Sequence, residues 1–98
     1  RNHPDEHASC FTNLGILTRV LNAGHKVGGF DLSFFRSEGG GLYRIGQSGV
    51  VAAKETRLYV YPDEEAKLIY VLGIGTKETQ QNDIKSAKKQ IKKINAAG

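Results

Sequence analysis

The chain has 98 residues, of which 39% are hydrophobic and 24% are charged, and its formal net charge is +4. This length predicts one domain with a modest core that needs no disulfide, and the composition is ordinary for a soluble globular protein. No apolar run reaches the length of a membrane span, so we expect no membrane partner. Cys10 is the only cysteine, which excludes an intramolecular disulfide and favours a reducing, cytoplasmic compartment.

The first predicted element is a helix from about His7 to Asn22. Residues 1–6 are polar and contain Pro4, so we interpret them as a flexible lead-in. Gly24 is placed to cap the C-terminal end of the helix. The helix is expected to bury one apolar face, formed by Ala8, Phe11, Leu14, Thr18 and Leu21 and widened by Ile16 and Leu17.

The middle of the chain predicts a sheet. Residues at 42–47, 55–61 and 67–74 alternate with a period of two and are rich in β-branched and aromatic types, which is typical of strands. A polar turn at Pro62–Glu65 joins the last two strands, because Pro62 presets one backbone dihedral and Asp63 can bond nearby backbone.

The connections upstream of these strands are less regular. Phe30 to Phe35 fits either a short edge strand or an irregular packed segment, and the sequence leaves this choice open. The glycine-rich run Ser37 to Gly41 is expected to be a flexible break, and Gln47 to Ala53 a mobile loop near the sheet edge.

The period changes to that of a helix at Ile84, which predicts a second helix over about 80–94. Its apolar face consists of Ile84, Ala87, Ile91 and Ile94. Together these elements predict an α+β fold: one compact domain over 1–98, with a twisted antiparallel sheet of three to four strands and two helices packed on it.

The positive charge of the chain is concentrated in this second helix. Residues 84–98 contain five lysines and no acidic residue, whereas residues 1–83 carry one net negative charge. Such a surface can meet phosphates or an acidic partner, although a solvated helix face is favoured on charge alone. The candidate phosphate contacts on this helix are Lys85, Lys88 and Lys89.

Two arginines lie within predicted strands. These are Arg44 and Arg57. In the strand alternation, both guanidiniums are expected on the face that we predict to lack helical cover, because the opposite face is taken by Tyr43, Ile45, Leu58 and Val60. Lys54 and Lys77 lie at strand ends nearby. Such a face can bind RNA phosphate or stabilise charge in phosphoryl transfer. The alternative is that the strand arginines pair with acidic neighbours, namely Glu55, Asp63 or Glu78.

Other chemistries have little support from spacing. The three histidines have no neighbouring cysteine or carboxylate that completes a zinc set, and Gly73-Ile74-Gly75 lacks the spacing of a phosphate-binding loop. Ser48 is not in a nucleophile elbow, and Cys10 lies on the expected buried face. We therefore predict no metal and no cofactor.

Several strings from Leu42 onward resemble the RelE/ParE toxin superfamily of bacterial type II toxin–antitoxin modules. The matching segments are Leu42–Ile45, Thr56–Tyr61, an acidic turn, Leu68–Ile74 followed by Gly75-Thr76-Lys77, and Gln80–Ile84 with Ala87. The pattern extends over about residues 8–94. The resemblance implies a compact fold with helices against a twisted antiparallel sheet, and a cognate antitoxin that neutralises the protein.

The resemblance also implies a target, which is either mRNA on the ribosome or DNA gyrase. In the RNA-cleaving branch, basic strand residues bind phosphate and stabilise developing charge while the RNA 2′-hydroxyl attacks. Arg57 and Lys77 match the two catalytic positions of that branch, and Arg44 and Lys54 assist. These expectations describe a ribosome-dependent mRNA endonuclease.

The chain departs from the family pattern at three places. The lysines expected after Ile45 are replaced by Gly46 and Ser48, and no tyrosine or histidine follows Lys77. The N-terminal strand of the family is also without a counterpart in residues 1–6. These departures keep two alternatives open: a non-enzymatic toxin directed at gyrase, or a catalytically inactive relative that retains protein contacts. Nucleic-acid binding through the lysines of residues 85–93 is a further alternative.

Overall fold

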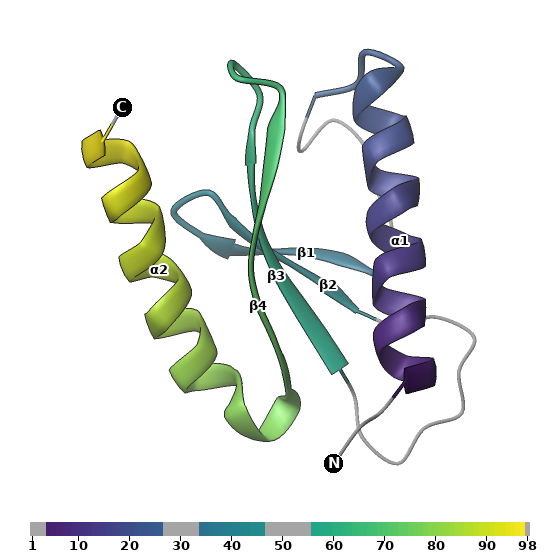
Figure 1. The fold of residues 1–98 in the computed structure, drawn as a ribbon, viewed down its shortest axis with the longest axis vertical. Helices are drawn as coiled ribbons and strands as arrows, with labels where there is room; N and C mark the ends of the chain where they lie inside the picture. Colours follow the sequence, from purple (N-terminus) through teal and green to yellow (C-terminus); the bar gives the residue numbers. More distant parts are fainter. Residues whose placement is uncertain (1–3, 27–33, 47–55, 98) are drawn as a thin grey trace.

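The computed structural model describes residues 4–26, 34–46 and 56–97, and Figure 1 shows how their elements are arranged. In chain order the elements are helix α1 (Pro4–Asn22), strands β1 (Phe35–Gly39), β2 (Leu42–Gly46), β3 (Thr56–Asp63) and β4 (Leu68–Thr76), the short 3-10 helix η1 (Lys77–Thr79) and helix α2 (Gln80–Ala97). The strands form one antiparallel sheet in the order β1-β2-β3-β4. The predicted α+β architecture, with two helices and an antiparallel sheet, is confirmed.

The two helices pack on opposite faces of the sheet (Figure 1). Successive side chains of a strand point to opposite faces, so Leu58 and Val60 of β3 join Cys10 and Leu17 of α1 in one buried cluster. Tyr59, between them in the sequence, packs against α2 in a second cluster with Leu42, Ala87 and Ile91. The sheet therefore has a core on each face, which accounts for the near-continuous burial of β3.

Helix α1 begins at Pro4, three residues before the predicted start. Proline is well tolerated in the first turn of a helix because its missing N–H would lack an intrahelical partner there. The interpretation of residues 1–6 as a flexible lead-in is therefore wrong for residues 4–6, while residues 1–3 lie outside the described part of the chain.

The buried face of α1 is also shifted from the predicted one. Cys10, Asn13 and Leu17 are buried, whereas Ala8 and Phe11 are exposed. The predicted positions Leu14 and Leu21 pack against the first cluster as expected. The face is shifted because the thiol of Cys10 and the amide of Asn13 lie against strand carbonyls. A pattern of apolar residues in the sequence does not predict such polar contacts.

The glycine-rich run is a hairpin turn and not a break. Ser37 to Gly39 belong to β1, and Gly40 and Gly41 form the turn to β2 with φ angles of 65° and 87°. Gly39, at the end of β1, also has a positive φ of 87°, and positive φ angles at a short hairpin strongly favour glycine. For Phe30 to Phe35, the choice between an edge strand and an irregular segment is decided only at Phe35, where β1 begins. Residues 30–33 are not described.

The β3–β4 hairpin is longer than predicted. Pro62 and Asp63 remain in β3, and the turn occupies residues 64–67, with Lys67 in a left-handed conformation (φ 59°). The strand predicted at 67–74 is thus β4 at 68–76, and the predicted loop at Gln47 to Ala53 lies outside the described residues.

Helix α2 confirms its predicted apolar face. Ala87 and Ile91 are buried and Ile84 packs against them, while the helix extends to Ala97, three residues beyond the predicted end. Near the C-terminal end of α2, the hydroxyl of Tyr61 donates a hydrogen bond of 3.0 Å to Oδ1 of Asn95. Neither helix of the described chain is both long and apolar enough to cross a membrane.

Candidate phosphate-binding site

The strand register brings the two predicted catalytic residues to the same end of the sheet. Thr56 of β3 pairs with Thr76 of β4, and Arg57 pairs with Gly75. Lys77 follows Thr76 directly and begins η1. Arg57 and Lys77 are therefore each one position from the same cross-strand pair. Their common position depends on the register, because nineteen residues lie between them in the chain.

Arg57 lies between two glycines on the neighbouring strands. Its partner on β2 is Gly46 and its partner on β4 is Gly75. Cross-strand partners share a sheet face, and glycine contributes no side chain to it. The half-buried guanidinium thus has no cross-strand side chain on either flank, and on the Gly75 side the first turn of α2 fills the space.

The first turn of α2 brings a carboxylate onto the same face. A Cβ atom placed on Gly75 would lie 2.0 Å from Oδ2 of Asp83 and 2.7 Å from Oγ1 of Thr79. The hydroxyl of Thr79 donates a hydrogen bond of 2.5 Å to that carboxylate oxygen, and the backbone N–H of Thr76 donates to Thr79 Oγ1 at 3.1 Å. Because Gly75 is the cross-strand partner of Arg57, the Asp83 carboxylate lies over the strand next to the arginine.

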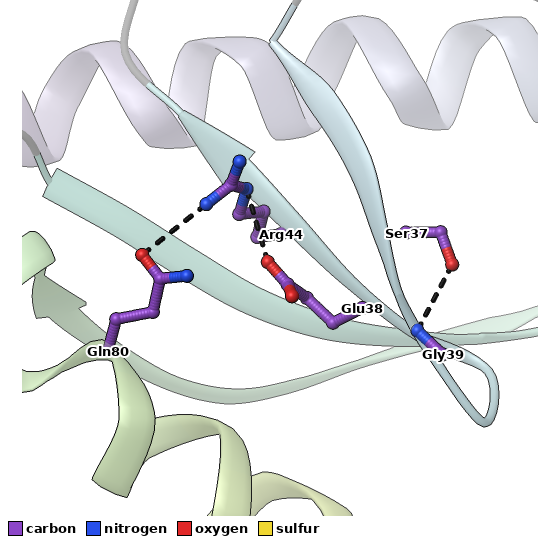
Figure 2. A network of polar contacts seen from close by, with 5 residues as sticks. All are labelled: Ser37, Glu38, Gly39, Arg44 and Gln80. Carbon is purple, nitrogen blue, oxygen red and sulfur yellow. Dashed lines mark hydrogen bonds and ion pairs between the residues drawn. The ribbon is translucent and has the colours of Figure 1, made fainter.

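Arg44 occupies the adjacent part of this face and is already engaged. Its Nε forms an ion pair with Oε2 of Glu38 at 3.2 Å, and its Nη1 donates a hydrogen bond to Oε1 of Gln80 at 3.4 Å (Figure 2). The guanidinium therefore connects β1, β2 and the start of α2.

This arrangement corrects two expectations about the arginines. The face that bears Arg44 and Arg57 is the face on which α2 packs, so it is not a face without helical cover. The acidic partner of Arg44 is Glu38, which lay in the supposed glycine-rich break and was not among the candidates. Only the β1–β2 hairpin, with Arg36 opposite Arg44, brings Glu38 close enough.

A buried tyrosine completes the electrostatic surroundings of the site. Tyr59 is 1% exposed, and its hydroxyl has no hydrogen-bond partner among the described residues. Burial raises the pKa of this phenol to about 12; the negative charges of Asp83 and Glu38 also raise the pKa, whereas the positive charges of Arg57 and Arg44 lower it. The phenol therefore stays protonated at neutral pH and is a poor proton acceptor.

Helix α1 supports the site from the other face. Nδ2 of Asn13 donates a hydrogen bond of 2.7 Å to the carbonyl of Gly46, and the Cys10 thiol lies 3.6 Å and 3.5 Å from the carbonyl oxygens of Ile45 and Thr56. These contacts hold the ends of β2 and β3 that flank Arg57. Burial raises the pKa of the Cys10 thiol to about 11, so this cysteine is not a nucleophile at neutral pH.

The predicted lysines do not join this site as a group. Lys85, Lys88 and Lys89 are exposed on α2, and Nζ of Lys88 approaches Gly39 at the β1–β2 hairpin, the opposite end of β2 from Gly46. Lys54 lies outside the described residues. The site that the structure describes thus consists of Arg57, Lys77, Arg44 and Asp83, of which sequence analysis missed Asp83.

The site offers cations and one carboxylate, and nothing in the described segments suggests a metal centre. Within residues 4–26, 34–46 and 56–97, no three His, Cys, Asp or Glu residues converge to bind an ion.

A scan against protein-family models and searches of curated proteins and solved structures returned no significant match.

Proposed function

We propose that this protein is the toxin component of a toxin–antitoxin module of the RelE/ParE type and that it cleaves mRNA on the ribosome. The observation that carries the proposal is the register that places Arg57 and Lys77 at one end of the β3–β4 ladder, with glycines on both sides of Arg57. The motifs from Leu42 onward support the same class, and the implied partners are a cognate antitoxin, the ribosome and mRNA in the cytoplasm.

In the proposed reaction the RNA supplies its own nucleophile. The 2′-oxygen attacks the adjacent phosphorus, the bond to the 5′-oxygen breaks, and a cyclic phosphate and a 5′-hydroxyl result. Arg57 and Lys77 bind the phosphate and stabilise the negative charge that develops on its oxygens. Arg44, with two of its donors already engaged, assists mainly through its charge.

A proton must leave the 2′-hydroxyl as it attacks. We assign its acceptance to the carboxylate of Asp83, which lies over the cross-strand partner of Arg57, while water protonates the leaving 5′-oxygen. With Asp83 in this role, the reaction does not need the tyrosine or histidine that the chain lacks after Lys77. Tyr59 is unsuited to the role because its raised pKa of about 12 keeps it protonated.

The test is inducible expression in bacterial cells, with growth measured and transcript ends mapped. We expect growth arrest and cleaved transcripts, and Arg57→Ala should relieve both, since loss of a charge-stabilising donor costs about 100-fold to 1,000-fold in rate. Arg19→Ala is the matched control, because Arg19 is an exposed arginine in the last turn of α1, outside the site. Growth arrest with intact transcripts would contradict the nuclease.

The same cells separate the alternatives. If growth stops while transcripts stay intact, a supercoiling assay with purified gyrase and purified protein decides whether gyrase is the target. If neither growth nor supercoiling changes, the protein is a binding protein without toxic activity. The wild-type chain and Arg57→Ala should be produced at equal levels in each comparison, so that an effect cannot arise from abundance.

A further inference from the structure

The arginines on the α2 face of the sheet continue from Arg57 to the edge strand β1. Arg57 pairs with Gly46 of β2. Arg44 lies two residues before Gly46 and pairs with Arg36 of β1. Cross-strand partners share a sheet face, and so do residues two apart on one strand. The three arginines therefore lie on one face and cross β3, β2 and β1 in turn, on strands about 4.8 Å apart.

The two sides of Arg57 differ in what covers them. On the β4 side, a Cβ on Gly75 would clash with Asp83, because the first turn of α2 lies there. On the β2 side, a Cβ on Gly46 would meet, among the described residues, one atom within 4 Å, the carbonyl oxygen of Phe34 at 3.9 Å. A ligand that reaches Arg57 across the described surface therefore comes from the side of β2 and β1.

Helix α2 lines this approach with lysines. Nζ of Lys88 lies 3.7 Å from the position that a Cβ would take on Gly39, so this flank of α2 faces the β1–β2 hairpin. Lys85 lies three residues before Lys88 and Lys92 four residues after it, which places all three on the same flank. All three are exposed. The opposite flank faces β4, which Gln90 contacts.

These arginines and lysines form one positively charged surface, which we call the basic band. Its residues are Arg36, Arg44, Lys85, Lys88 and Lys92. Glu38 is the acidic residue on β1, and β2 and this flank of α2 carry none. The Glu38 carboxylate is paired with Arg44 at 3.2 Å (Figure 2). Five positive charges and one negative charge leave the band with a net charge of +4.

The absence of apolar side chains from the band indicates the kind of partner. In the described part of the chain, the large apolar side chains that are exposed lie on α1 and β4 and are Phe11, Leu68, Val71 and Ile74. A protein interface has an apolar core with aromatic anchors, whereas the backbone of a nucleic acid is bound through its phosphates by charge. The band therefore suits a chain of phosphates better than an acidic protein.

We propose that the basic band binds the single strand of RNA that adjoins the scissile phosphate, through its phosphates and without regard to base sequence. The choice of RNA rests on the proposed function, because the band leads to Arg57 from the side that α2 leaves open. Arg44 and Arg36 contact phosphates on the β1 side of the scissile one, and the lysines of α2 line the other side of the strand.

The experiment measures binding of a labelled RNA of about 12 nucleotides by fluorescence anisotropy. Every ribose carries a 2′-O-methyl group, so the strand cannot be cleaved and binding is measured whether or not the protein is a nuclease. Affinity should fall steeply as the salt concentration rises. Poly-glutamate at equal charge and vesicles of anionic phospholipid should not displace the RNA, and displacement by either would overturn RNA as the occupant.

Variants locate the surface that binds. Arg36→Glu/Lys88→Glu should weaken RNA binding about 10-fold or more, because it reverses two charges of the band. Arg19→Glu/Lys93→Glu is the matched control, since it makes the same change in net charge on α1 and on the side of α2 that points away from the sheet. It should weaken binding less than about 3-fold. Arg36→Lys/Lys88→Arg keeps both charges and should bind like wild type. Equal losses in the two charge-reversed variants would overturn the band.

The salt dependence and transcript mapping in cells separate this proposal from the nuclease. Arg36→Gln/Lys88→Gln removes two phosphate contacts and should lower the slope of log affinity against log salt by about 1.4. If that shift is found while wild type leaves transcripts intact, the nuclease fails and the band stands. If wild type cleaves transcripts and this variant keeps the affinity and the slope of wild type, the band fails and the nuclease stands.

Discussion

Gly75→Ala is the substitution for which the structure predicts the clearest loss of stability. The added Cβ would lie 2.0 Å from Oδ2 of Asp83, 2.7 Å from Oγ1 of Thr79 and 3.0 Å from Cγ of Asp83. No carbon atom fits at these distances, so the first turn of α2 must move away from β4 or Asp83 must rotate. The backbone of Gly75 is not in the left-handed region, which makes space the only reason for glycine here.

The magnitude follows from what the movement breaks. Overpacking a tight contact costs about 1–3 kcal/mol. Rotation of Asp83 also gives up its hydrogen bond with Thr79, and loss of one such bond costs about 1 kcal/mol. We therefore expect Gly75→Ala to lower the free energy of unfolding by about 2–4 kcal/mol.

The assay is urea unfolding followed by circular dichroism, with Gly73→Ala as the control in the same strand. A Cβ on Gly73 would meet nothing within 4 Å, so this variant should stay within about 0.5 kcal/mol of wild type. Asp83→Ala in the Gly75→Ala background should recover part of the loss, because it removes the clashing atoms. Equal stability of Gly75→Ala and Gly73→Ala would refute the argument that Asp83 occupies the space above Gly75.

Two further predictions concern buried groups. Tyr59→Phe should raise the free energy of unfolding by about 1 kcal/mol in the same urea assay. The reason is that it removes a buried hydroxyl without a described hydrogen-bond partner. A destabilised variant would indicate that the hydroxyl is bonded. Alkaline pH should destabilise the protein through Cys10, whose pKa rises from 9.0 to about 11 on folding. The stabilising contribution is complete below pH 9 and is lost as the pH rises from about 9 to 11, because the unfolded thiol ionises first. Across that range, wild type should lose up to about 3 kcal/mol more than Cys10→Ala, and parallel pH profiles of the two proteins would contradict this account.

Local sequence signals predicted most of the elements but not their ends. The period of two in Leu58 to Val60 and the helical period of Ile84, Ala87 and Ile91 depend on short-range geometry, so β3 and α2 were predicted close to where they lie. The start of α1 at Pro4 and the hairpin at Gly40 were missed. Proline and glycine are read as breaks by pattern, although both also serve at helix starts and tight turns.

The sequence by itself determined the α+β class, the apolar faces of β3 and α2, and the concentration of lysines on the last helix, because each follows from the order of residue types along the chain. Tertiary structure alone decided which charged groups meet. Strand register and helix packing bring Arg57, Lys77 and Asp83 to one end of the sheet, and Arg44 pairs with Glu38 through the β1–β2 hairpin. The position of β4 at the edge of the sheet was also decided only by the tertiary structure, because local sequence does not specify the order of strands in a sheet.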